Sequence, residues 1–140
     1  MDLIDTLSIS ASGLSAQRVR LQTVASNMAN ARTTRTAEGG PYQRQMPVFE
    51  ADNSGFSGAL ERNLARVDVT EIQSDDGDPL RVYDPGHPDS DEFGYVDYPN
   101  INVLEEMVDL MTTARTYEAN TNVVNTTRDM ASTALEIGRL

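Results

Sequence analysis

The sequence contains no cysteine, no lysine and no tryptophan, and its aromatic residues are three phenylalanines and five tyrosines. Without cysteine, a disulfide framework, a thiolate metal site and a thiol nucleophile are all excluded. Large aromatic side chains normally supply much of the buried area of a core, so their scarcity argues against one large core in this chain of 140 residues. No apolar run is long enough to span a bilayer, so we expect no direct membrane insertion.

We also expect no cleavable signal peptide, because the N-terminus lacks a basic stretch followed by a continuous apolar segment. Any export from the cytoplasm is therefore expected to use another route. The formal net charge of −11 argues against nucleic acid as a partner. Most of the acidic residues, all six prolines and seven of the nine glycines lie between residues 37 and 101. This composition divides the chain into an N-terminal helical arm (1–36), a β-rich insert (37–101) and a C-terminal helical arm (102–140).

The N-terminal arm is expected to be helical over residues 3–29. Its apolar stripe is narrow, which is typical of a coiled-coil seam and not of a helix on a broad core. The a positions of the predicted heptads are Ile4, Ala11, Arg18 and Ala25, and the d positions are Leu7, Leu14, Leu21 and Met28. Such a seam requires a partner helix.

The insert is predicted to form a small antiparallel β element. Alternating patterns predict strands over residues 41–51 and 65–73, and shorter strands over 80–83 and 93–96. Pro47 restricts the first of these to an edge strand or a bulged strand. A loop is expected at 52–58, and turns rich in acid, proline and glycine separate the later strands.

The C-terminal arm supplies the partner helix. Asn102 and Glu105 have the spacing of a capping box at its start, and Gly138 suits its end. Its apolar series comprises Val103, Met107, Leu110, Ala114, Tyr117, Val124, Ala131 and Leu135. We therefore predict a mostly α fold, in which the long N- and C-terminal helices pair as a coiled-coil-like hairpin with the β insert between them.

Motifs that carry chemistry are weak in this sequence. The acidic loop 84–92 contains the only histidine, but an EF-hand frame that begins at Asp89 fails at Phe93 and Asn100. One histidine without cysteine supplies too few of the usual zinc ligands, so we interpret the loop as a solvated turn. The alternative is a soluble metal- or cell-wall-binding module at 84–92. There is no catalytic triad motif and no phosphate loop. We predict no enzyme activity, no catalytic or metal-binding residues and no cofactor.

Both ends of the chain resemble the flagellar axial proteins, the family of rod, hook and hook-associated proteins. The N-terminal resemblance lies in residues 10–14 and in the Ala-Ser-Asn-Met-Ala-Asn run of residues 25–30. Further segments are similar to the proximal rod proteins of that family, namely 39–51, 82–96, 99–107 and 114–120. The family commonly continues its N-terminal signature with Thr-x-Gly, from which Thr34-Arg35-Thr36 departs.

The resemblance implies a structural subunit of the proximal rod, the periplasmic drive shaft of the flagellar basal body, that transmits torque. It also implies export by the flagellar export apparatus without a cleavable signal. The implied partners are copies of the chain itself, other rod proteins (the FlgB, FlgF and FlgG types) and the adapter FliE. Assembly is expected to use the terminal helices, through Ile4, Leu7, Leu14, Leu21, Asn27, Met28, Asn30, Val103, Met107, Leu110, Tyr117, Val124 and Leu135.

Overall fold

The structure is a computed structural model that describes residues 3–52 and 66–138. Its elements are α1 (Leu3–Asn30), β1 (Gln45–Asp52), β2 (Arg66–Ser74), β3 (Leu80–Tyr83), β4 (Tyr95–Tyr98) and α2 (Val103–Ile137). The prediction of two long terminal helices with a small β insert is confirmed. Most of the predicted loop at 52–58 and the start of the second predicted strand lie outside the described residues.

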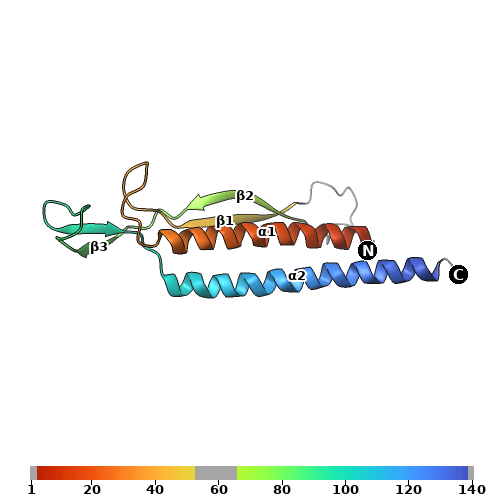
Figure 1. Cartoon of the computed structure of the whole chain (residues 1–140). Helices are drawn as coiled ribbons and strands as arrows, with labels where there is room; N and C mark the ends of the chain where they lie inside the picture. Colours follow the sequence, from red (N-terminus) through yellow and green to blue (C-terminus); the bar gives the residue numbers. More distant parts are fainter. Residues whose placement is uncertain (1–2, 53–65, 139–140) are drawn as a thin grey trace.

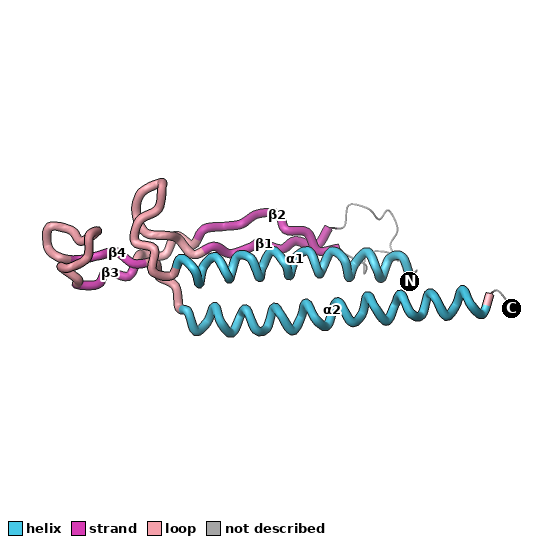
Figure 2. Tube along the Cα trace, in the orientation of Figure 1, coloured by secondary structure: helices cyan, strands magenta, loops and turns pink. Residues whose placement is uncertain are grey.

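Helix α1 is the central layer of the molecule (Figure 1). Helix α2 runs antiparallel along one side of α1, and the β1–β2 hairpin lies along the other side. The β3–β4 hairpin extends beyond the helices at the end where α1 finishes and α2 begins (Figure 2). The opposite end of the molecule therefore holds both the start of α1 and the end of α2.

Helix α2 begins at the cap that the sequence predicts. Asn102 Oδ1 accepts a hydrogen bond from the Leu104 N–H (3.1 Å), and Asn102 Nδ2 donates to Glu105 Oε1 (3.0 Å). The first contact satisfies a free N–H of the first turn, and the Glu105 charge lies at the positive end of the helix dipole. At the other end, the Gly138 N–H donates to the Ala134 carbonyl oxygen (3.1 Å).

The four predicted strands form two separate two-stranded antiparallel sheets. Every strand is consequently an edge strand, which is compatible with the proline in β1. The β1–β2 register shifts between Val48 and Phe49, one residue after Pro47. Strand β1 begins later than predicted because the preceding segment crosses the end of α1. There, the Tyr42 N–H donates to the Thr33 carbonyl oxygen (3.0 Å).

Strand β4 also begins later than predicted, because residues 91–94 form a turn. The Gly94 N–H donates to the Asp91 carbonyl oxygen (3.0 Å), and the Asp91 N–H donates to the Tyr95 carbonyl oxygen (2.8 Å). Gly94 has a φ of +80°, which side chains with a Cβ rarely adopt. A Cβ on Gly94 would lie 2.9 Å from the Tyr83 ring. Both the backbone and the ring packing therefore require glycine here.

The structure does not confirm that α1 and α2 pair through the predicted heptad seam, because only its d positions, Leu7, Leu14, Leu21 and Met28, are partly enclosed. All four predicted a positions lie on the exposed side of α1, and Ile4 is 72% exposed. The reason is that α1 is covered on two sides, so one narrow apolar stripe cannot serve both contacts. The residues of α2 that are buried are Glu106, Thr113 and Thr127, none of which belongs to the predicted apolar series. Helix α2 therefore turns part of its apolar stripe outward.

The enclosed core is small, in agreement with the scarcity of aromatic residues. Among the described residues, the buried apolar side chains are Ala16, Val24, Val96 and Pro99, while five polar or charged side chains are buried as well. Packing between the two helices thus depends on small and polar groups that fit together.

Candidate assembly surface

A polar cluster joins α1, α2 and the start of β1 at one end of the helix pair, with Asn27 at its centre. The Asn27 amide nitrogen donates to the Gln45 carbonyl oxygen (2.9 Å) and to Glu106 Oε2 (3.2 Å). Its amide oxygen accepts from the Gln45 N–H (2.9 Å) and from the Tyr42 hydroxyl (3.2 Å). These four contacts use the full hydrogen-bonding capacity of the amide, so Asn27 connects three elements of its own chain.

Glu106 is the charged member of this cluster and is 1% exposed. Arg44 Nε donates to Glu106 Oε1 at 2.7 Å, while Asn27 donates to the other carboxylate oxygen. Enclosing a carboxylate is costly unless it is paired and hydrogen-bonded. Glu106 is therefore held at one position, and with it the alignment of α2 along α1.

The sequence signals described above pointed to neither Glu106 nor Arg44 as a buried pair. A signal was present, because Glu106, Thr113, Asn120 and Thr127 recur at intervals of seven residues. A heptad assignment based on apolar residues alone does not detect this polar repeat. At Gly13 on α1, an added Cβ would lie 3.3 Å from Asn120 Nδ2, so glycine allows a close approach at that level of the helix pair.

The outward side of α2 carries an exposed apolar surface near the start of the helix. We call it the α2 outer patch, and it consists of Val103, Leu104, Met107, Val108 and Met111. Leu104, at 74%, is its most exposed member. Contiguous exposed apolar residues of this kind mark sites of protein contact.

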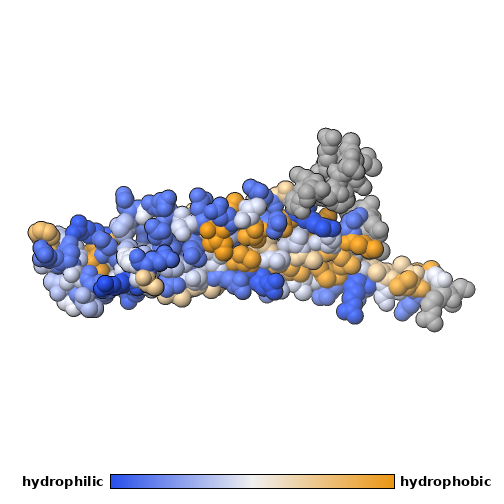
Figure 3. All heavy atoms as spheres, turned by 90° about the horizontal axis from the view of Figure 1, so that it is seen from above, coloured by the Kyte–Doolittle hydropathy of each residue, from blue (hydrophilic) through white to orange (hydrophobic). Residues whose placement is uncertain are grey.

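A second apolar group lies where α2 continues past the start of α1 (Figures 1 and 2). It includes Met130, Leu135 and Ile137, all exposed. In the view from above, apolar side chains gather over the middle and right of the molecule, and polar ones cover most of the β3–β4 end (Figure 3). The side of the molecule that carries the β1–β2 hairpin therefore also presents apolar surface (Figures 1 and 3).

The residues predicted for the assembly interface differ in accessibility. Those on the exposed surface are Ile4, Val103, Met107, Tyr117 and Leu135. Those partly enclosed by the chain are Leu7, Leu14, Leu21, Met28, Asn30, Leu110 and Val124. Asn27 is 1% exposed. Its side chain is occupied within the chain and is not available at the surface.

Polar groups of the acidic loop 84–92 bind one another and the segment that follows α1. Asp89 accepts a hydrogen bond from the Thr34 hydroxyl (2.8 Å) and pairs with Arg35 (3.7 Å), and His87 Nδ1 accepts from the Asp89 N–H (3.1 Å). Over residues 3–52 and 66–138, no group of three or more histidine, aspartate or glutamate side chains is arranged to hold a metal ion. These contacts attach the loop to the segment after α1.

Asp91 organises the turn between β3 and β4. Its Oδ1 accepts from the Phe93 and Tyr95 N–H groups (2.8 Å each), and its other oxygen accepts from the Arg81 guanidinium. The Tyr95 N–H makes the largest contribution to lowering the pKa of the Asp91 carboxyl, desolvation partly opposes it, and Phe93 and Arg81 lower the pKa further. The ionised carboxylate is thus the form that holds the turn.

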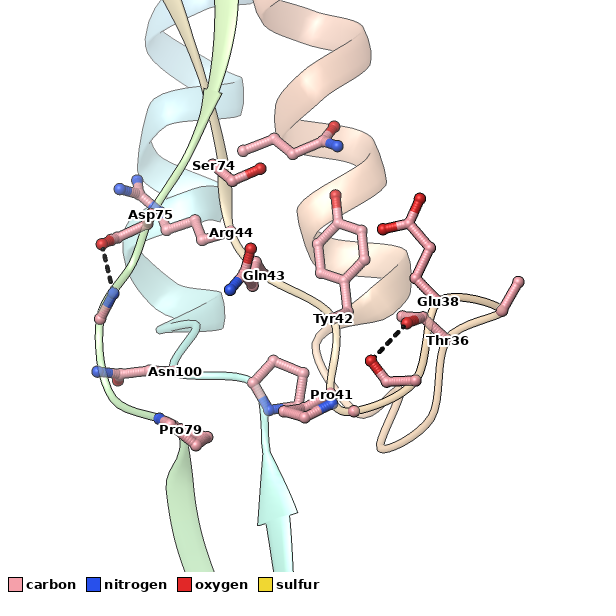
Figure 4. A pocket seen from close by; sticks show the side chains of 16 residues that line it. Thr36, Glu38, Pro41, Tyr42, Gln43, Arg44, Ser74, Asp75, Pro79 and Asn100 are labelled. Carbon is pink, nitrogen blue, oxygen red and sulfur yellow. Dashed lines mark hydrogen bonds between the residues drawn. The ribbon is translucent and has the colours of Figure 1, made fainter.

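A hollow with a volume of about 690 Å³ lies where the segment after α1 meets the ends of the two hairpins (Figure 4). Its labelled side chains include Glu38, Tyr42, Arg44, Asp75 and Asn100. Arg44 is committed to Glu106, and Asp75 Oδ1 accepts the Gly77 N–H (3.0 Å). The hollow presents no pair of groups that suggests a reaction.

Neither described helix is both long and apolar enough to cross a membrane. Two protein families match the chain. The family described as "Flagella basal body rod protein" matches residues 7–35, which cover most of α1. The family described as "Flagellar basal body rod FlgEFG protein C-terminal" matches residues 94–137, from the turn before β4 to the end of α2.

Similar proteins extend the match over nearly the whole chain. The flagellar basal-body rod protein FlgC of Bacillus subtilis is 42% identical, with 99% of this chain and 100% of the relative covered. FlgC of Borreliella burgdorferi is 40% identical, with 98% of each chain covered. FlgC of Salmonella typhimurium is 36% identical, with 99% and 100% covered. At this identity and coverage, the chain belongs to the FlgC family of flagellar basal-body rod proteins.

Proposed function

We propose that the chain is a structural subunit of the proximal rod of the flagellar basal body, that it assembles through its terminal helices, and that it transmits torque. Its relatives are named as rod proteins, a structural class and not an enzymatic one. The observation that carries the proposal is the exposed apolar surface along α2, which a subunit standing alone would leave in water.

The mode of assembly follows from this surface. Copies that meet through two different patches generate open helical assemblies, whereas a self-complementary patch generates closed dimers. Exposed Ile4, Val103, Met107, Tyr117 and Leu135 lie on both helices and are available to neighbours. We propose that these side chains, together with the partly enclosed d positions of α1, complete coiled-coil-like contacts between subunits.

The chain would be exported by the flagellar apparatus without a cleavable signal and would reside in the periplasmic rod. Its neighbours would be copies of itself, the FlgB, FlgF and FlgG types of rod protein, and the adapter FliE. The helical arms (1–36 and 102–140) would form the assembly body, with the insert (37–101) directed toward other subunits.

The test replaces two exposed side chains of the α2 outer patch by charges, Leu104→Asp together with Met111→Asp, in a strain that lacks the native protein. Neither residue is buried, so the isolated subunit is expected to keep its circular-dichroism spectrum. Basal bodies should lack a continuous rod in electron micrographs, and motility should be lost.

The matched control is Leu104→Ile together with Met111→Leu, which keeps both positions apolar and should preserve rods and swimming. Normal rods in the aspartate variant would show that the α2 outer patch is not an assembly surface.

A further inference from the structure

The β3–β4 hairpin carries three exposed aromatic side chains. Tyr83 and Tyr95 are a cross-strand pair whose rings meet edge to face, with centroids 5.3 Å apart. Phe93, in the turn between the strands, is 77% exposed and Tyr83 is 64% exposed. We call Tyr83, Phe93 and Tyr95 the hairpin aromatic face. A two-stranded hairpin has no second layer to cover such a face.

This face is held in one conformation. The Asp91 carboxylate binds the backbone N–H groups of Phe93 and Tyr95, and Gly94 leaves room for the Tyr83 ring. The Arg81 guanidinium lies 5.0 Å from the centre of the Tyr95 ring. Rings that are already ordered lose little conformational entropy when a partner binds, which favours recognition.

The charge around the aromatic face selects the chemistry of the partner. Residues 80–98 contain one arginine, Arg81, no lysine and one histidine, His87, and the Arg81 guanidinium is committed to Asp91. The acidic side chains in this segment are Asp84, Asp89, Asp91, Glu92 and Asp97. Aromatic rings attract cations through their negative faces, and the carboxylates add to that attraction. The complement is therefore a surface that carries arginine or lysine beside small side chains.

A second copy of this chain offers that surface on the exposed side of α1. Arg18 is exposed there and makes no ion pair with the described residues. Ser15 and Ala25, one and two turns away, are exposed and small, so rings can approach the helix beside the guanidinium. Arg18 lies twelve residues before the end of α1, about 18 Å along the helix axis. The β3–β4 hairpin extends past that same end and points away from Arg18 of its own chain (Figure 1).

We propose that the hairpin aromatic face of one copy docks on the exposed side of α1 of a second copy, around Arg18. This inference rests on the proposed assembly into a rod. It adds a contact made by the insert, through cation–π attraction and charge complementarity, to the apolar contacts of α2. The two contact surfaces differ, as an open helical assembly requires.

The test places a photoreactive side chain at the face, Phe93→p-benzoylphenylalanine, in cells that assemble basal bodies. Irradiated basal bodies are purified, digested and analysed by mass spectrometry. The expected adduct joins the peptide with position 93 to a peptide from residues 11–25 of another copy. The same photoreactive residue at Gln73, which is exposed on β2, serves as the control and should not give this adduct.

Arg18→Glu should lower the yield of the adduct by about tenfold, and Arg18→Lys should keep most of it, because lysine retains the positive charge. An adduct with a different protein, with a glycan or with no partner at all would overturn the docking proposal, as would an unchanged yield in Arg18→Glu. Absence of the chain from purified basal bodies would instead contradict the proposed function, so the two failures are distinguishable.

Discussion

Asn27 Nδ2 donates a hydrogen bond to Glu106 Oε2 at 3.2 Å, across 79 residues of sequence. Both side chains are 1% exposed, and both belong to helices whose other enclosed residues are small or polar. A buried polar pair of this kind adds little net stability but penalises every alignment in which its members do not meet. We infer that the pair fixes how α1 and α2 align.

Removing the partner of the buried carboxylate tests its energetic role. Arg44→Ala leaves Glu106 enclosed with one hydrogen bond from Asn27, and the free energy of unfolding should fall by about 3 kcal/mol. Replacing Glu106 and Arg44 together by methionine should cost less than Arg44→Ala alone, since no charge is then left unpaired. Urea unfolding followed by circular dichroism measures both changes. Equal losses in the two variants would contradict this account of the pair.

A pH dependence should appear in Asn27→Asp, which places a second carboxyl group beside Glu106. The Glu106 carboxylate should raise the pKa of the introduced aspartate in the folded state, so the variant keeps its stability below the pKa that this aspartate has in the unfolded chain and loses stability as the pH rises toward the raised pKa. The melting temperature of Asn27→Asp should therefore approach that of the native chain below about pH 4. Asn27→Ala, which removes the same hydrogen bonds without adding charge, should show a deficit that varies less with pH.

The turn before β4 should not tolerate a side chain at Gly94. Gly94→Ala forces a Cβ into a left-handed conformation, which costs about 1–2 kcal/mol, and brings it 2.9 Å from the Tyr83 ring. The expected result is loss of the Tyr83–Tyr95 ring contact, visible as collapsed chemical-shift dispersion of the tyrosine ring protons in NMR spectra. Gly86→Ala, at a glycine without a positive φ, is the control. Unchanged ring shifts in Gly94→Ala would show that the turn adapts.

Acid should loosen the same turn at a predictable pH. The pKa of Asp91 lies below its ordinary value of 3.8, so its contribution to hairpin stability is complete above that pH. This contribution is lost as the pH falls through the lowered pKa, because the protonated carboxyl binds the two N–H groups and Arg81 less strongly. Hydrogen exchange of the Phe93 and Tyr95 amides should accelerate only in that acidic range. Asp91→Asn should give fast exchange at all pH values.

The helices and strands could be predicted from short sequence motifs. Asn102 with Glu105 marks the start of α2, alternation marks the strands, and Pro47 marks an irregular edge, because each signal acts within a few residues. The ends of β1 and β4 were misplaced for the opposite reason. Contacts from outside each strand, by Thr33 in one case and Asp91 in the other, take up backbone groups that the strand pattern assigns to pairing.

The packing surfaces were harder to predict than the elements. Heptad reasoning assumes that one helix faces one partner and that apolar residues mark the contact. Here α1 has two packed sides, and the side of α2 that is enclosed carries Glu106, Thr113 and Thr127. The apolar residues left outside, such as Leu104 and Met111, become intelligible only when neighbouring chains are considered. The sequence contains both the residues that pack inside the chain and the apolar residues that remain exposed. Only the three-dimensional arrangement shows which residue belongs to which group.

The two ends of the long axis of the molecule are different. One end presents the start of α1 and the projecting last turns of α2, with Leu135 and Ile137 in the open, and the other end presents the rigid hairpin with Phe93 (Figure 2). Copies stacked along this long axis in a common orientation build a fibre whose two tips are chemically unlike. An incoming subunit can then distinguish the tip at which it adds from the tip at which the fibre is anchored.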